Sequence, residues 1–154
     1  MTDAAASLVQ DDELLIERTF DASRELVFRV WTKPEHLMRW WGPKDYTVVA
    51  FDQDFQVGGA YRSCIRAPDG SDNWMGGVYR EIVPNARIVM TFRWEHGDWG
   101  VDNLVTVTFD DAPGGRTRFR FHQAPFTTVE ARDSHIGGWS SLLDKLAKYL
   151  ESEQ

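Results

Sequence analysis

The longest amphipathic stretch of the chain is 127-TTVEARDSHIGGWSSLLDKLAKYL-150. Its first residues, Thr127-Thr128-Val129-Glu130, have the form of a capping box, in which a threonine side chain caps the first turn of a helix. The residues of one stripe then recur at helical spacing, and they are Ala131, His135, Trp139, Leu142, Leu143, Leu146 and Leu150. This pattern predicts a long helix that ends near Leu150 and lays an apolar face on another layer.

The layer beneath this helix is predicted to be an antiparallel sheet. Its expected strands, chosen for alternation or for β-branched and apolar content, are 13–20, 46–55, 60–66, 74–83, 87–94, 103–109 and 117–123. Short breaks rich in Gly, Pro, Asn and Asp separate the last six, which favours a meander over βαβ units. Two short amphipathic helices, 23–32 and 34–41, follow the first strand, and Gly42-Pro43 ends the second.

The composition indicates one domain with a large aromatic interior. The 154 residues include seven Trp, nine Phe and four Tyr, which is a heavy aromatic load for a chain of this length. We expect a frayed or disordered tail over residues 1–12 and a single domain over residues 13–152.

Charge and cysteine content exclude several classes of partner. The formal charge of −7 and the pI near 5.0 disfavour binding to nucleic acid or to an anionic membrane surface. No apolar run approaches the ~20 residues of a membrane-spanning helix. Cys64 is the one cysteine, and the N-terminus lacks the features of a secretory signal. We therefore expect a cytoplasmic protein, a monomer or homodimer, without a cofactor.

Several motifs resemble those of a known family. They are 18-RTFDASRELVF-28, 31-WTKPEHL-37, 40-WWGP-43, 77-GVYREIVP-84 and His135-x-x-Gly138-Trp139. Together they resemble the START-like (SRPBCC, helix-grip) superfamily, and within it the C-terminal domain of the activator of heat-shock-protein-90 ATPase. The resemblance implies an α+β helix-grip fold: a curved antiparallel sheet of about six or seven strands, two short helices after the first strand, and a long C-terminal helix over the sheet.

The resemblance also implies a function. Relatives in this superfamily hold lipids, hormones or aromatic molecules between sheet and helix, so we expect binding of an apolar or amphipathic small molecule. One alternative is a co-chaperone-like domain that stimulates a heat-shock chaperone ATPase, although the family's namesake makes much of its chaperone contact through a separate N-terminal domain. The other is a cyclase, dehydratase or hydrolase that uses a cavity histidine, and we favour it least.

Aromatic and apolar residues at inward positions are the candidate ligand-binding residues. They are Trp40, Trp41, Phe55, Tyr61, Met75, Met90, Phe92, Trp94, Val107, Phe119, Phe121, Gln123, His135, Gly138, Trp139, Leu142 and Leu143. The same spacing is also typical of a solid core, so both interpretations stay open.

The polar groups and glycines at inward positions each allow two interpretations, one functional and one structural. His135 is the best candidate for a polar anchor or a general base, whereas the simpler interpretation is a histidine that hydrogen-bonds the backbone; Tyr61 and Gln123 are weaker candidates. Gly137-Gly138 should destabilise the helix, so it indicates either the close approach of a strand or, less favoured, space left for a ligand.

One loop contains three residues of the types that bind metals. His96, Asp98 and Asp102 do not match the spacing of a zinc site, and we interpret this loop as a solvated turn. We therefore expect no metal.

Overall fold

Seven antiparallel strands form one curved sheet in this computed structural model, which describes residues 10–95 and 102–154. The strands are β1 (Leu14–Phe20), β2 (Thr47–Gln53), β3 (Ala60–Arg66), β4 (Asp72–Val83), β5 (Arg87–Trp94), β6 (Asn103–Ala112) and β7 (Arg116–Ala124). Their order across the sheet is β1-β7-β6-β5-β4-β3-β2, so β2 to β7 form the predicted meander. The helices are α1 (Arg24–Thr32), α2 (Pro34–Trp40) and α3 (Val129–Ser152). This is the predicted α+β helix-grip fold.

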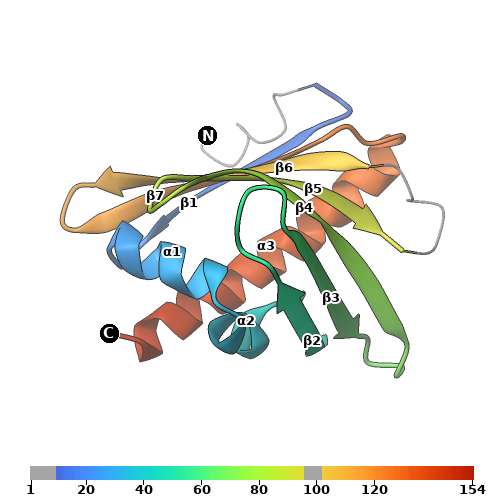
Figure 1. Ribbon diagram of the computed structural model, residues 1–154, viewed down its shortest axis with the longest axis horizontal. Helices are drawn as coiled ribbons and strands as arrows, with labels where there is room; N and C mark the ends of the chain where they lie inside the picture. Colours follow the sequence, from blue (N-terminus) through green and yellow to red (C-terminus); the bar gives the residue numbers. More distant parts are fainter. Residues whose placement is uncertain (1–9, 96–101) are drawn as a thin grey trace.

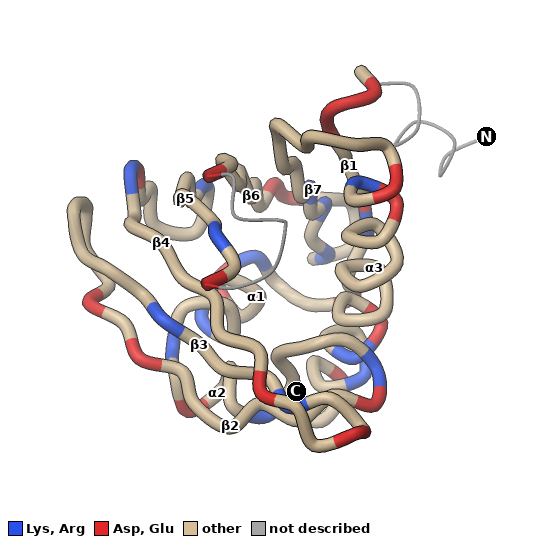
Figure 2. Tube along the Cα trace, turned by 90° about the vertical axis from the view of Figure 1, so that its right-hand side faces the viewer, with Lys and Arg blue, Asp and Glu red and all other residues tan. Residues whose placement is uncertain are grey.

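The three helices lie on one side of the sheet (Figure 1). α3 crosses the concave face, α2 packs against α3, and α1 packs against α2, β6 and β7. Figure 2 shows α3 standing opposite β3 and β4 across the opening of the curved sheet. No helix in the described part of the chain is long and apolar enough to cross a membrane.

The strands alternate as the sequence predicts. On β6, Val105, Val107 and Phe109 are fully buried, and on β7 Phe119 and Phe121 are fully buried. The residues between them on β7 are exposed or half-buried. One face of the sheet therefore packs under the helices, and the other faces solvent.

The first strand takes a position that the local pattern does not reveal. β1 pairs with β7, from Leu14 opposite Gln123 to Phe20 opposite Thr117. This pairing joins the start of the chain to its last strand and makes β1 one edge of the sheet.

Two irregularities curve the sheet around α3. The register shifts between Val48 and Ala50 on β2 and between Tyr79 and Glu81 on β4, and such bulges bend a strand. At Gly77 the backbone of β5 approaches so closely that a Cβ would collide with the carbonyl oxygen of Thr91. The sheet therefore needs a glycine at this position.

The stripe of α3 is confirmed, and its start is corrected by one residue. All seven predicted stripe residues are buried, Trp139 with 6% of its surface exposed. The N-cap is Thr128, whose hydroxyl oxygen accepts a hydrogen bond from the Ala131 amide at 3.0 Å. The capping box that Thr127 and Glu130 suggested is therefore wrong, because Glu130 lies one position too early to be its third helical residue.

Candidate functional site

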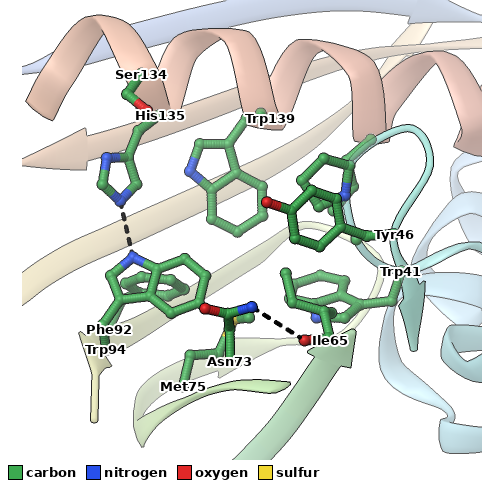
Figure 3. Close-up of a pocket in the computed structure, with 14 residues that line it drawn as sticks. Trp41, Tyr46, Ile65, Asn73, Met75, Phe92, Trp94, Ser134, His135 and Trp139 are labelled. Carbon is green, nitrogen blue, oxygen red and sulfur yellow. Dashed lines mark hydrogen bonds between the residues drawn. The ribbon is translucent and has the colours of Figure 1, made fainter. Parts of the chain in front are cut away.

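A cavity of about 520 Å³ lies between α3 and the β3-β4-β5 part of the sheet, and it is partly open to solvent. Figure 3 shows side chains from the helix and from the strands pointing into it from opposite sides. Its lining residues are Trp41, Gly42, Pro43, Tyr46, Ile65, Asn73, Met75, Phe92, Trp94, Ser134, His135, Gly138, Trp139 and Leu142. Most of these are aromatic or aliphatic, so the interior is suited to an apolar molecule.

Helical periodicity explains which part of α3 forms the wall. Ser134, Gly138 and Leu142 are spaced four residues apart and face the cavity, beside the stripe positions His135 and Trp139. Since Gly138 has no side chain, the helix leaves open space at this point of the wall.

Trp139 is fixed by one buried hydrogen bond and three ring contacts. Its indole Nε1 donates to Gln123 Oε1 at 2.7 Å, and Gln123 Nε2 in turn donates to Asn103 Oδ1 at 2.9 Å. The Trp139 ring centroid lies 4.4 Å from that of Phe121 and 5.7 Å from that of Phe92. Gln123 is fully buried and is not a lining residue, and its side chain holds the Trp139 ring in the cavity wall.

His135 forms a bridge between α3 and β5. Its Nδ1 lies 2.7 Å from the Ala131 carbonyl oxygen, and its Nε2 accepts a hydrogen bond from Trp94 Nε1 at 3.0 Å. A carbonyl oxygen needs a donor, so Nδ1 carries the proton and the ring is neutral. Burial lowers the pKa of His135, against the hydrogen bond to Ala131, which raises it. The backbone-bonded interpretation of this histidine is therefore the better one.

The loop after α2 forms the mouth of the cavity. Gly42 adopts φ +96°, a conformation that favours glycine, and brings Pro43 and Tyr46 against α3. Lys145 Nζ donates to the Gly42 carbonyl oxygen at 3.0 Å and lies 3.4 Å from that of Pro43. Loss of hydration lowers the pKa of Lys145, while nearby Asp45 raises it. This lysine therefore holds the loop onto the helix.

Trp41 separates the cavity from the densely packed core. Its ring centroid lies 5.4 to 5.8 Å from those of Trp31, Trp40, Phe51 and Trp139. Its indole nitrogen is buried and has no hydrogen-bond partner among the described residues. Ring packing alone therefore determines the position of this wall.

The surroundings of Gly137 and Gly138 do not match the close approach of a strand that we favoured from the sequence. No atom lies within 4 Å of a Cβ built on Gly137, and the nearest atom to one on Gly138 is Pro43 Cγ at 3.7 Å. A close approach of a strand is therefore wrong. Gly137 faces solvent, and Gly138 lines the cavity beside a loop.

The predicted binding residues fall into two groups. Those that line the cavity are Trp41, Met75, Phe92, Trp94, His135, Gly138, Trp139 and Leu142. Those that do not are Trp40, Phe55, Tyr61, Met90, Val107, Phe119, Phe121, Gln123 and Leu143. Most of the second group belong to the packed core between the sheet and α1, α2 and α3, so the solid-core interpretation describes them.

Tyr61 illustrates why shared strand parity did not separate the two groups. It is buried with Phe51 and Tyr79, and its hydroxyl donates to the Thr91 carbonyl oxygen at 2.7 Å. Burial, with a smaller contribution from Tyr79, raises the pKa of Tyr61 well above its usual value. The Tyr61 hydroxyl is therefore engaged within the core, and Tyr61 does not line the cavity.

Six lining residues were not predicted: Gly42, Pro43, Tyr46, Ile65, Asn73 and Ser134. Two signals could have found some of them. Asn73 shares the parity of Met75 on β4, and Ser134 lies one helical turn before Gly138. The loop residues gave no such signal, because a helix stop does not show where the following loop packs.

The proposed solvated turn lies largely outside the described residues. His96 and Asp98 are not described, while Asp102 pairs with Arg93 at 3.1 Å. Within the described ranges, no group of three His, Cys, Asp or Glu side chains could hold a metal ion.

The curved sheet, the long helix and the cavity between them define a helix-grip domain of the START-like superfamily. The chain belongs to the family of Activator of Hsp90 ATPase homolog 1-like proteins, whose model matches residues 21–151. This confirms the family that the motifs resembled. Such domains are in general of a ligand-binding or activator type.

Solved structures of similar proteins share this fold along nearly the whole chain. One from Chromobacterium violaceum is 26% identical with a TM-score of 0.83, covering 90% of this chain and 96% of its own. The AHSA1 protein from Silicibacter pomeroyi is 26% identical with a TM-score of 0.80, covering 92% and 99%. A protein from Rhizobium leguminosarum is 30% identical with a TM-score of 0.78, covering 91% and 94%. No curated protein matches the sequence.

Proposed function

We propose that this protein binds an apolar or amphipathic small molecule, lipid-like or aromatic, in the cavity between α3 and β3-β5. The observation that carries the proposal is the cavity itself, whose volume of about 520 Å³ lies within the range of small-molecule sites. Trp41, Phe92 and Trp139 contribute aromatic rings to its lining. The ligand is held mainly by burial of its own apolar surface.

Burial on this scale supports useful affinity. At ~25 cal/mol per Å², removing about 200 Å² of apolar ligand surface from water contributes on the order of 5 kcal/mol before the costs of association. Burial alone therefore corresponds to a dissociation constant of roughly 0.2 mM or weaker for first screening hits. Tighter binding requires polar contacts in addition.

A thermal-shift screen tests the proposal. The probes are fatty acids, fatty alcohols, fused aromatic compounds and polyketide-like compounds, each at several concentrations. A ligand that binds only the folded state raises the melting temperature in a concentration-dependent manner. Hits whose effect is lost in Gly138→Leu, which fills the mouth, support the proposal, with Gly137→Leu on the solvent side as the matched control. A screen without hits, together with a crystal structure whose interior is filled by side chains, would overturn it.

A second candidate function is a co-chaperone-like domain that stimulates a heat-shock chaperone ATPase. The observation that favours it is the match to the family of Activator of Hsp90 ATPase homolog 1-like proteins over residues 21–151. Measurement of the chaperone's ATPase rate with increasing amounts of this protein tests it. Stimulation that saturates supports the co-chaperone role, whereas an unchanged rate at high micromolar protein refutes it.

We also propose a cytoplasmic location. Cys64 is the one cysteine of the chain, so no disulfide within the chain requires an oxidising compartment. Fractionation of the native host with an antibody against this chain tests the location.

A further inference from the structure

The described lining of the cavity contains no Asp, Glu, Lys or Arg. Strand alternation explains this absence on the sheet side. Arg66 follows the lining residue Ile65, and Asp72 precedes the lining residue Asn73, yet both charges point to the outer face and pair there at 2.7 Å. A charged ligand group in the cavity would thus lose hydration without gaining an opposite charge from the described lining residues.

Two basic side chains beside the cavity, Lys145 and His135, are already engaged. Lys145 donates to the carbonyl oxygens of Gly42 and Pro43 and is not a lining residue. His135 is a lining residue, but it is neutral, since its Nδ1 donates to Ala131 and its Nε2 accepts from Trp94. Neither group supplies a positive charge to an incoming carboxylate.

Neutral polar groups remain available near the mouth. Figure 3 shows the Tyr46 hydroxyl directed toward Trp139 across the cavity. This hydroxyl has no hydrogen-bond partner among the described residues, and Tyr46 is half-buried. The Asn73 amide nitrogen makes only long contacts, 3.3 Å to Ser71 O and 3.5 Å to Ile65 O. Tyr46 can therefore donate or accept one hydrogen bond, and Asn73 can accept one.

The walls favour flat rings over flexible chains. The Trp139 ring is inclined at 68° to the rings of both Phe92 and Trp41, with centroids 5.7 and 5.6 Å away. Aromatic faces and edges of this kind attract a further aromatic ring in stacked or edge-to-face geometry. A rigid ring system also loses less conformational freedom on binding than an alkyl chain does.

We propose that the cavity selects uncharged aromatic molecules that carry a hydroxyl or carbonyl group, and that it rejects the corresponding carboxylates. This specificity rests on the proposed function of the same site. The ring system packs among Trp41, Phe92 and Trp139, and the polar group hydrogen-bonds to Tyr46 or Asn73. Carboxylates are rejected because their charge would be buried without a partner.

Isothermal titration calorimetry with matched probes tests the selectivity. Naphthalene, 2-naphthol and 2-naphthoate share one ring system and differ in one substituent. At neutral pH we expect 2-naphthol to bind at least about tenfold more tightly than 2-naphthoate, because only the latter buries a charge. The Tyr46→Phe variant should narrow the difference between 2-naphthol and naphthalene, since it removes the hydroxyl that contacts the substituent.

The salt dependence of binding distinguishes selectivity caused by the cavity lining from selectivity caused by the net charge of the protein. The net charge of −7 also repels anions, but at ionic strength near 1 M that long-range repulsion is screened. A preference for 2-naphthol that persists at high salt supports the proposal, because loss of hydration is local. A preference that disappears at high salt overturns it.

Three further outcomes distinguish the selectivity for uncharged aromatic molecules from small-molecule binding in general. If 2-naphthoate binds as tightly as 2-naphthol at neutral pH, the selectivity is refuted while small-molecule binding stands. If fatty alcohols bind and all three naphthalene probes fail, the aromatic preference is refuted and the cavity still binds ligands. If no compound of any class binds, both proposals fail.

Discussion

Gly137 and Gly138 lie next to each other in α3 and offer a matched pair of substitutions. A glycine within a helix costs up to about 1 kcal/mol relative to alanine. A Cβ on Gly137 meets no atom within 4 Å, and one on Gly138 meets Pro43 Cγ at an ordinary contact distance of 3.7 Å. Alanine at either position should therefore raise the free energy of unfolding by about 0.5 to 1 kcal/mol.

Leucine at the same positions should separate stability from binding. At Gly137 the new side chain projects into solvent, so ligand affinity should stay near the wild-type value. At Gly138 it occupies the mouth of the cavity beside Pro43, so affinity should fall at least about tenfold. Urea unfolding measures the stability of all four variants, and calorimetry with one screening hit measures their affinity.

The expected stability changes are small but measurable. One kcal/mol shifts the melting temperature of a domain of this size by about 2 to 4 °C. If Gly138→Leu folds and binds the hit as wild type does, the mouth is not where we place it. Equal loss of affinity in both leucine variants, or a Gly138→Ala variant that is strongly destabilised, would also refute the reasoning about this face of α3.

Three further predictions follow from buried contacts. Because burial lowers the pKa of His135, the unfolded chain binds more protons than the folded protein does. The free energy of unfolding should therefore fall as pH drops from the usual histidine pKa toward the lower pKa of the folded protein. His135→Gln keeps an acceptor for Trp94, and its urea unfolding curves at several pH values should lack this contribution. Trp139→Phe leaves the buried Gln123 oxygen without its donor and should cost at least about 1 to 3 kcal/mol in urea unfolding. Leu143→Ala should cost about 2 to 5 kcal/mol yet leave ligand affinity unchanged in calorimetry, since Leu143 is fully buried outside the cavity; a loss of affinity would place it in the site.

The periodic parts of the fold were predictable because local patterns report burial directly. The stripe of α3 from Ala131 to Leu150 is buried as its spacing predicts. Strands β3 and β5 begin and end at the predicted residues. In these segments each inward side chain meets the same apolar layer, so its sequence position alone indicates its environment.

Long-range arrangement was less accessible. The pairing of β1 with β7 depends on a contact between Ile16 and Phe121, more than a hundred residues apart, which no local period encodes. Parity also cannot distinguish a side chain that lines a cavity from one that fills a core. Met75 and Tyr61 both face inward and are buried, but only Met75 lines the cavity.

The mouth of the cavity was missed for a related reason. The sequence marks Gly42-Pro43 as the end of a helix, and nothing in it shows that Lys145 holds this loop against α3. Likewise, the chemistry of His135 depends on Trp94, a partner on another element. Side-chain partners across elements follow from the assembled fold, not from spacing along the chain.

The most direct test of small-molecule binding is a crystal structure of the protein with its tightest-binding screening hit. We expect ligand density between α3 and β3-β5, in contact with Trp139 and Phe92 and with the ligand's polar group within hydrogen-bond distance of Tyr46 or Asn73. Ligand density found only on the outer face of the sheet, with the cavity itself closed by the rings of Trp41 and Trp139, would contradict this expectation.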